Sequence, residues 1–493
     1  MKRIALISLA LILAIFILIE IYASSRPRPL SYPFEDRNMF FGLTQLKSNS
    51  DLEDATHLNV SWVSMQPIVV WCLIEKEPGK YDWNMLDSTV KKIQRINLDC
   101  CPVLYPITIP EERKDEVLNM IKAEGATAFL HSNLAAELKL YPHGESLKKW
   151  KKFVKALAER YDGDGIKDMP GLRFPIRYWH LLEEYPETWL GPDIDLVYLS
   201  ILKATWEGLT SADPEAKIVL MGLAGNYARF FAYIDGYIKD EDAGVWMGVK
   251  YTRSQISENP KVKKLKQMYE HILAAGKEYF DVVDIHLYEE KITFTPGKIK
   301  WLLSKMKEYK YTKPVWCIEG GGPFKIPTGT SPKHGDPYFG YYTDKENSEY
   351  VIKIHVIAAA LGIERMHWAL KGTPKDSYWD GPWWVMALKS SEGARKPSYY
   401  TFKLLVEKLQ GFTEVSNLSS ENLQLYMFKT PKGTVYIAWS NNIGTYNLTN
   451  IFGNTSLKLT KIFTEEQSDY NTNETIANAY NIELSETPVF IEP

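Results

Sequence analysis

Apolar residues follow two spacings along most of the chain, and these two spacings alternate. Short apolar runs typical of strands are followed by longer stretches in which apolar residues recur every third or fourth position, as on one face of a helix. The pattern predicts strands at residues 40–45, 60–66, 99–107, 176–184, 217–223, 282–288, 314–319 and 365–370. It predicts helices at residues 51–58, 83–96, 146–161, 193–211, 261–277, 296–309, 345–360 and 398–409.

This alternation predicts one large α/β unit over residues 38–411. Strands that are each followed by a helix favour a closed (β/α)8 TIM barrel over an open sheet. The chemistry of such barrels takes place at the carboxyl ends of the strands. Insertions follow several strand ends, so we expect them to form the walls of a cleft on that side; they are residues 108–145, 225–259, 321–344 and 372–382.

The pattern changes after residue 411. Helical spacing disappears, and short alternating segments separated by turns take its place, at residues 423–429, 435–440, 457–463 and 487–491. Such segments predict a small all-β, sandwich-like domain over residues 412–493. Two roles are open for this domain: it packs against the barrel and covers apolar surface, or it binds carbohydrate.

The first residues have the pattern of a targeting segment. Lys2 and Arg3 precede a long apolar run, and small residues follow it. This order is typical of a secretory signal, but residues 4–23 also have about the length of a membrane span, roughly 20 residues. We therefore expect residues 1–25 to be either a cleaved signal peptide or an uncleaved signal anchor, and residues 26–37 to be a linker. In both cases the protein is predicted to be extracellular or at the cell surface.

Composition narrows the class of partner. The chain has 493 residues and a formal net charge of -3, which provides no general attraction for nucleic acid. It has 15 Trp and 30 Tyr, and these rings either fill the barrel core or line clefts where the apolar face of a sugar can stack. A carbohydrate is the expected substrate, and membrane contact is expected only through the N-terminal segment.

The cysteines do not indicate a metal site. The chain has four, Cys72, Cys100, Cys101 and Cys317, and their spacing is not that of metal ligands. They are predicted to be buried thiols, although a bridge from Cys72 to Cys100 or Cys101 stays open in an exported protein. We predict neither a metal nor a cofactor.

Two of the predicted strands end in glutamate. The fourth ends at Glu184 and the seventh at Glu319, although an apolar strand has no structural need for a terminal carboxylate. Two carboxyl groups facing each other are the apparatus that cleaves glycosidic bonds, and they lie about 5 to 5.5 Å apart in enzymes that retain the anomeric configuration. Glu319 is the predicted nucleophile, because the glycines after it leave room for a sugar. Glu184 is the predicted acid/base.

Other strand ends supply groups that support this pair. Asp284, His286 and Tyr288 alternate along the sixth strand and so share one face. Tyr288 is expected to hydrogen-bond Glu319 and hold it ionised, and His286 to orient a sugar hydroxyl. Trp368, near the end of the eighth strand, is expected to lie beneath the sugar, although a tryptophan in a strand more often belongs to the core.

Several segments carry a resemblance to a known family. Residues 71–83 read WCLIEKEPGKYDW, and residues 159–165 read ERYDGDG ahead of the fourth strand. With residues 178–184, 314–319, the His286-x-Tyr288 pair and residues 396–400, they resemble the large clan of retaining (β/α)8 glycoside hydrolases. The resemblance covers residues 38–493. It implies two catalytic glutamates on strands four and seven, at Glu184 and Glu319, in an exported enzyme that cleaves β-glycosidic bonds in oligo- or polysaccharides.

One residue departs from the pattern of that clan. The residue before the acid/base is Asn in the clan, where it binds the sugar 2-hydroxyl, and here it is Glu183. The resemblance implies that Glu183 binds the substrate. The change from Asn to Glu is expected to alter which sugar the site accepts. Because adjacent strand residues face opposite sides, it is also open whether Glu183 or Glu184 points inward. The alternative function is a membrane-anchored carbohydrate-binding or adhesion protein on a catalytically inactive barrel.

Overall fold

The computed structural model describes most of the chain. It covers residues 29–493 except residues 36, 45, 47, 110–112, 125–139, 184–192, 224, 247–248, 290, 323–342, 373–385 and 463–471. The predicted segment 1–25 therefore lies outside the described residues. Among the residues that are described, no helix has both the length and the apolar character needed to cross a membrane.

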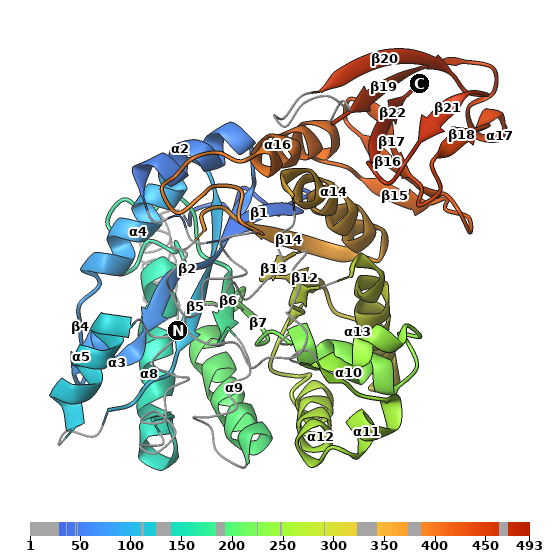
Figure 1. The fold of residues 1–493 in the computed structure, drawn as a ribbon. Helices are drawn as coiled ribbons and strands as arrows, with labels where there is room; N and C mark the ends of the chain where they lie inside the picture. The colour runs from blue at the N-terminus through green and yellow to red at the C-terminus, as the bar shows by residue number, and fades with distance from the viewer. Residues whose placement is uncertain are drawn as a thin grey trace, which may run out of the picture.

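The centre of the molecule is a parallel barrel (Figure 1). Its strands are β1 (Phe41–Thr44), β2 (Trp62–Val70), β5 (Asp99–Tyr105), β6 (Tyr178–Leu181), β7 (Lys217–Val219), β10 (Val283–Asp284), β12 (Val315–Cys317) and β14 (Ile363–Ala369). They hydrogen-bond in the order β10-β12-β14-β1-β2-β5-β6-β7. Parallel bridges from Val219 to Val282 and from Leu223 to Ile285 join the two ends of this sheet. The predicted (β/α)8 barrel is confirmed.

Helices surround the barrel in the predicted order. They are α2 (Asn49–Leu58), α4 (Asn84–Arg95), α8 (Gly144–Tyr161), α9 (Ile194–Thr210), α12 (Pro260–Ala275), α13 (Thr295–Glu308), α14 (Asp344–Ala360) and α16 (Pro397–Leu409). The pair α8 and α9 shows how apolar residues at helical spacing bury one face of a helix. Trp150 and Val154 are buried on α8, and Gly208 of α9 faces Val154, where an added Cβ would lie 2.2 Å from Val154 Cγ2. The missing side chain lets the two helices pack closely.

The insertions after the strands contain short elements that the spacing did not predict. They are α3 (Trp71–Ile74), β3 (Glu75–Glu77), β4 (Lys80–Tyr81), α5 (Lys114–Glu124), α10 (Gly225–Ile234), η2 (Glu241–Gly244), β8 (Val245–Trp246), β9 (Val249–Lys250), α11 (Arg253–Glu258) and η3 (Ile292–Phe294). Most of the predicted insertions 321–344 and 372–382 lie outside the described residues.

The amino-terminal half of the barrel interior is filled by aromatic rings around one arginine. The Arg365 guanidinium lies 4.2 Å from the ring centre of Trp316 and 4.7 Å from that of Tyr178. It donates to Asp99 Oδ2 at 2.8 Å. This stacked ion pair fills the centre of the barrel at its amino-terminal end.

The C-terminal residues form a separate antiparallel sheet. Its strands are β15 (Glu414–Asn417), β16 (Gln424–Thr430), β17 (Gly433–Trp439), β22 (Val489–Glu492), β19 (Ser456–Lys461) and β20 (Asn473–Asn478), in that order. A smaller pair joins β18 (Gly444–Tyr446) to β21 (Ile482–Leu484), and α17 (Thr449–Phe452) lies between them in the chain. The fold class predicted for this region is confirmed. The edge strands β15 and β20 escaped prediction because exposed edges carry polar residues.

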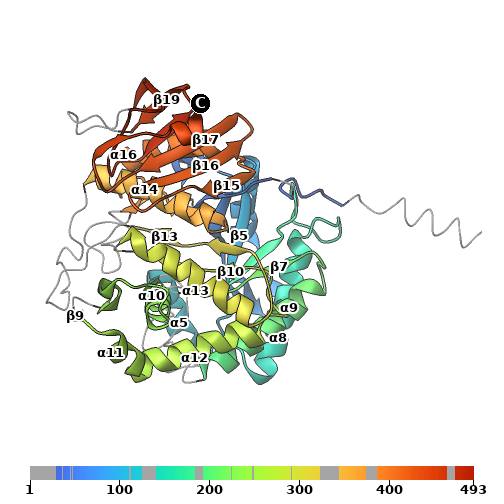
Figure 2. The same ribbon diagram turned by 90° about the vertical axis from the view of Figure 1, so that its right-hand side faces the viewer.

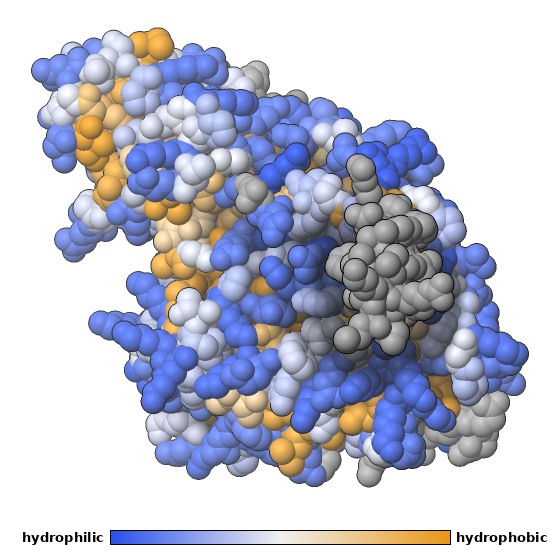
Figure 3. All heavy atoms as spheres, turned by 180° about the vertical axis from the view of Figure 1, so that it is seen from behind, coloured by the Kyte–Doolittle hydropathy of each residue, from blue (hydrophilic) through white to orange (hydrophobic). Residues whose placement is uncertain are grey.

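This sheet packs on the barrel and covers apolar surface. Phe412 packs edge-to-face against Phe40 of the barrel and Phe428 of the sheet, with ring centres 5.4 and 5.3 Å apart. Figure 2 shows the sheet lying over α14 and α16. Seen from behind, the surface is mainly hydrophilic, with apolar atoms gathered on the C-terminal sheet and at its junction with the barrel (Figure 3).

The described part of the expected 26–37 linker is attached to the barrel. The amide of Leu30 donates to Gly163 O at 2.7 Å, and Tyr32 Oη donates to Asp99 Oδ2 at 2.6 Å. The ring of Phe34 is buried against Phe174. The chain therefore reaches β1 along the amino-terminal face of the barrel.

All four cysteines are free in the structure. Cys100, Cys101 and Cys317 are buried, and Cys72 is half-buried. Burial raises the pKa of Cys72 to about 12. The alternative of a bridge from Cys72 to Cys100 or Cys101 is not realised, and the prediction of buried thiols holds for three of the four.

Candidate active site

Glu319 lies at the carboxyl end of the seventh barrel strand. Its side chain is nearly enclosed, since only 4% of the residue is exposed. Tyr288 Oη donates a hydrogen bond to Glu319 Oε2 at 3.0 Å. His286 Nδ1 lies 3.4 Å from the same oxygen. The structure thus brings together three residues that the sequence placed at neighbouring strand ends.

Side chains from other strands hold the backbone around Glu319. The strand β12 ends at Cys317, and a short parallel pair, β11 (Leu287–Tyr288) and β13 (Gly320–Gly321), continues beyond it. Between the end of β12 and β13, the amide of Ile318 donates to Asp284 Oδ1 at 2.8 Å. The amide of Gly320 donates to His367 Nε2 at 2.7 Å. These bonds replace sheet hydrogen bonds at the position where the carboxylate must be aimed.

His367 has a defined tautomer in this arrangement. Its Nε2 accepts from Gly320, so the hydrogen is on Nδ1, which lies 2.9 Å from Ser64 Oγ. Ser64 in turn donates to Ile318 O at 3.3 Å. Burial holds the pKa of His367 well below its usual value, which keeps the ring neutral and able to accept.

A second buried group lies beneath His286. Asp284 Oδ2 is 3.0 Å from His286 Nε2 and 3.5 Å from His180 Nε2. Burial lowers the pKa of His180 to about 4, so this ring is neutral at ordinary pH. Gly222 faces the cluster, and a Cβ added to it would lie 2.0 Å from His286 Nε2. A glycine is therefore needed at this position.

Glu183 lies at the same end of the barrel. Leu182 has a left-handed backbone with φ of 66°, which turns the chain out of β6. The carboxylate of Glu183 accepts from Tyr105 Oη at the end of β5, and its carbonyl accepts from Gly222 N at 3.0 Å. Glu183 is half-buried at the mouth. Glu184, the predicted acid/base, lies outside the described residues.

The structure corrects the role expected for Trp368. The side chain of His367 points into the barrel, so that of Trp368 points outward to α14. Its ring centre is 5.3 Å from that of His355 on that helix, and its Nε1 donates to Met386 O at 3.0 Å. Trp368 has no exposed surface. Trp368 therefore belongs to the core, and the prediction that it lies beneath a sugar is wrong for this structure.

Sequence reasoning missed several residues of the site. His180, Ser64, Tyr105 and His367 were not assigned to it, although each lies on a predicted strand. A polar residue on the inward-facing side of an apolar strand was the available signal. Alternation alone does not say which face of a strand is inward, because both faces of a barrel strand are apolar.

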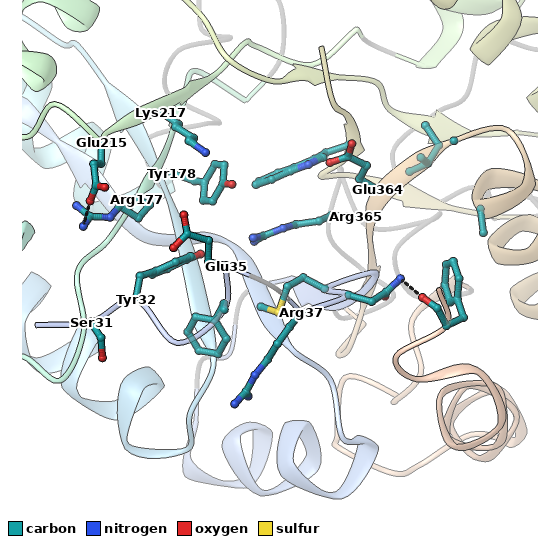
Figure 4. A pocket seen from close by; sticks show the side chains of 18 of the residues that line it. Ser31, Tyr32, Glu35, Arg37, Arg177, Tyr178, Glu215, Lys217, Glu364 and Arg365 are labelled. Carbon is teal, nitrogen blue, oxygen red and sulfur yellow. Dashed lines mark hydrogen bonds and ion pairs between the residues drawn. The ribbon is translucent and has the colours of Figure 1, made fainter. Parts of the chain in front are cut away.

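A pocket among the described residues lies at the opposite end of the barrel. It has a volume of about 760 Å³ and is lined by residues at the starts of β6, β7 and β14 and by the segment before β1. Figure 4 shows Tyr32, Tyr178, Lys217, Glu364 and Arg365 around it. Barrel chemistry takes place at the carboxyl ends. This pocket is therefore not the candidate active site.

One group among the described residues has the geometry for a cation. Asp162, Asp164 and Asp168 lie together in the loop before β6, at the amino-terminal face. Backbone amides within the same loop already donate to them, at 2.7 Å from Ile166 to Asp164 and at 2.7 Å from Gly165 to Asp168. The loop is at the far end of the barrel from Glu319.

The chain has the fold of several solved glycoside hydrolases. A family 39 glycoside hydrolase from Bacteroides cellulosilyticus superposes with a TM-score of 0.59 at 14% identity, over 92% of this chain and 81% of that one. A glucosidase from Croceicoccus marinus superposes with a TM-score of 0.56 at 9% identity, over 94% and 97%. A β-porphyranase of family 86 from Bacteroides plebeius gives 0.51 at 12%, over 94% and 75%.

This likeness is one of fold. No model of a protein family matches the sequence, and no curated protein matches it. At identities this low, the shared architecture shows a (β/α)8 barrel with a C-terminal β domain. The chemistry must be argued from the residues at the carboxyl end of the barrel.

Proposed function

We propose that this chain is a retaining glycoside hydrolase that cleaves β-glycosidic bonds in oligo- or polysaccharides. The observation that carries the proposal is Glu319: a carboxylate at the carboxyl end of the seventh strand, almost buried, which accepts from Tyr288. A hydrogen bond to the charged form of a carboxyl favours that form. Burying an ionisable group beside donors at a barrel mouth serves catalysis rather than folding.

The mechanism follows from the two carboxyl groups. Glu319 attacks the anomeric carbon, while Glu184 gives its proton to the leaving oxygen; the C–O bond to the leaving group breaks as the ester bond to Glu319 forms. Glu184 then takes a proton from water, whose oxygen attacks the same carbon and releases Glu319 as a carboxylate. Glu183 is proposed to hold a sugar hydroxyl next to the reacting carbon. His286 was expected to orient a hydroxyl as well, but its ring has no exposed surface and its two nitrogens face Asp284 and Glu319, so we do not assign it that role.

A substrate panel tests the proposal. The purified protein is expected to release sugar from at least one of a set of aryl β-glycosides, β-glucans, xylans and mannans. The first product seen by ¹H NMR is expected to be the β-anomer, because two displacements restore the configuration. An α-anomer as first product would contradict the mechanism. Binding without turnover across the whole panel would instead support a carbohydrate-binding protein on an inactive barrel.

We further propose that the protein is exported and works at or beyond the cell surface. The support is the charged start and the apolar run of residues 4–23. The first described residues run along the amino-terminal face, where Leu30 bonds Gly163, so the N-terminal segment joins the barrel on the face opposite Glu319.

Cell fractionation checks this placement. The full chain is expected in the membrane fraction or the medium, and a chain lacking residues 1–25 is expected to stay in the cytoplasm. N-terminal sequencing of the exported form separates cleavage from anchoring. Recovery of the full chain in the cytoplasm would contradict export.

A further inference from the structure

The ring of His286 lies between two buried carboxylates. Its Nε2 is 3.0 Å from Asp284 Oδ2, and its Nδ1 is 3.4 Å from Glu319 Oε2. Asp284 and His286 have no exposed surface. We propose that Asp284 is a positioning residue that acts as the buried counter-ion of a protonated His286, and that this ring holds the nucleophile Glu319 in its ionised form. The inference rests on the function proposed above.

Hydrogen-bond chemistry determines the charge of the ring. An ionised carboxylate only accepts hydrogen bonds, so each ring nitrogen that faces one must carry a hydrogen. A neutral ring has one such hydrogen, and Asp284, which is closer, would take it. The lone pair on Nδ1 would then face Glu319 and repel a carboxylate there. Two ionised carboxylates therefore require the imidazolium form.

Asp284 is itself held in place from several sides. Its Oδ1 accepts from the amide of Ile318 at 2.8 Å, next to Glu319 in the chain. Its Oδ2 also lies 3.5 Å from His180 Nε2. Gly222 packs against the pair, where an added Cβ would lie 2.7 Å from Asp284 Oδ2. The carboxylate of Asp284 thus holds in place both the ring of His286 and the backbone next to Glu319.

The other groups around His286 do not supply this charge. His180 on β6 and His367 on β14 are both kept neutral, because burial lowers the pKa of each. Lys298 on α13 donates to the carbonyl of His286 at 2.8 Å and is paired with Glu289. Tyr288, on the same strand, donates its hydroxyl to Glu319. His286 is the ring whose Nδ1 the structure places 3.4 Å from Glu319 Oε2.

The Asp284→Asn variant separates this role from a merely structural one. The amide oxygen still accepts from Ile318, but the NH2 group must donate to His286 Nε2, which makes the ring neutral. The acidic limb of the pH profile of kcat/KM is expected to move up by about one pH unit, because Glu319 loses a positive neighbour. We expect kcat to fall about tenfold at the wild-type optimum. A profile with an unshifted acidic limb would overturn the proposal.

An NMR measurement tests the ring directly, whether or not the protein hydrolyses sugars. In ¹⁵N-histidine-labelled wild-type protein near pH 7, both ring nitrogens of His286 are expected to carry hydrogens, with His286→Asn providing the assignment. A neutral ring would overturn the proposal even if Asp284→Asn does not fold. An imidazolium in a protein that fails the substrate panel would leave the ion pair standing and reject the glycosidase function.

Discussion

Replacing Glu319 by Gln is expected to abolish hydrolysis with little change in stability. The amide keeps an oxygen that can accept from Tyr288, so the packing at the end of β12 is conserved. The amide cannot attack the anomeric carbon, and loss of a nucleophile costs at least about 10³-fold in kcat. Initial rates on the best substrate of the panel and a thermal unfolding curve measure the two effects.

Matched variants identify the role of each carboxyl. Glu364→Gln makes the same change on β14 at the opposite end of the barrel, where the residue is exposed, and it is expected to leave the rate unchanged. With azide added, Glu319→Ala is expected to form an α-glycosyl azide, because azide enters from the vacated face. Glu184→Ala is expected to form the β-glycosyl azide from the covalent intermediate. A β-azide from Glu183→Ala instead would reassign the acid/base.

Replacing Lys298 by Met is expected to destabilise the fold by about 3–5 kcal/mol. Lys298 is fully buried on α13, where it pairs with the buried Glu289 and donates to the carbonyl of His286. Met keeps the apolar stem but leaves the Glu289 carboxylate without its cation. That carboxyl can escape the cost by taking up a proton, so the loss is expected to be larger at pH 8 than at pH 5. Denaturant unfolding at both pH values measures it.

Two comparisons check that explanation. Lys300→Met lies on the same helix at an exposed position, and it is expected to change stability by less than about 0.5 kcal/mol. The double variant Lys298→Met with Glu289→Gln removes both charges, and it is expected to recover part of the lost stability. Equal losses in the single and double variants would show that the ion pair is not the cause.

The fold was predictable because its signal is local and repeated. In α8, for example, Trp150 and Val154 recur at helical spacing and are buried as expected. The edge strands β15 and β20 were missed, because an exposed edge strand carries polar residues and so contains no run of apolar residues. The attachment of Leu30 and Tyr32 to the barrel was missed for a related reason: single contacts leave no period in a sequence.

The site was predictable where a carboxylate or a ring lies at a strand end. Tyr288 was expected to bond Glu319, and the structure has that bond. Trp368 shows the limit of this reasoning. A shift of one residue along a strand decides whether a side chain points toward the sugar or into the core, and the sequence does not fix that shift. His367 and Ser64 were missed for a different reason. Their side chains contact the backbone on either side of Glu319 from strands that are distant in the sequence, and local spacing does not show such contacts.

The sequence by itself determined that strands and helices alternate into a barrel and that Glu319 follows the seventh strand, because both depend on the order of residue types. The placement of Glu184 at the end of the fourth strand stays a prediction. Only the tertiary structure showed that Asp284, His367 and Ser64 hold the backbone next to Glu319. The strands β10 and β12 pair in parallel, so that Asp284 reaches both the amide of Ile318 and the ring of His286. Such contacts depend on which strands are neighbours and on the inward direction of each side chain, and neither is encoded in local spacing.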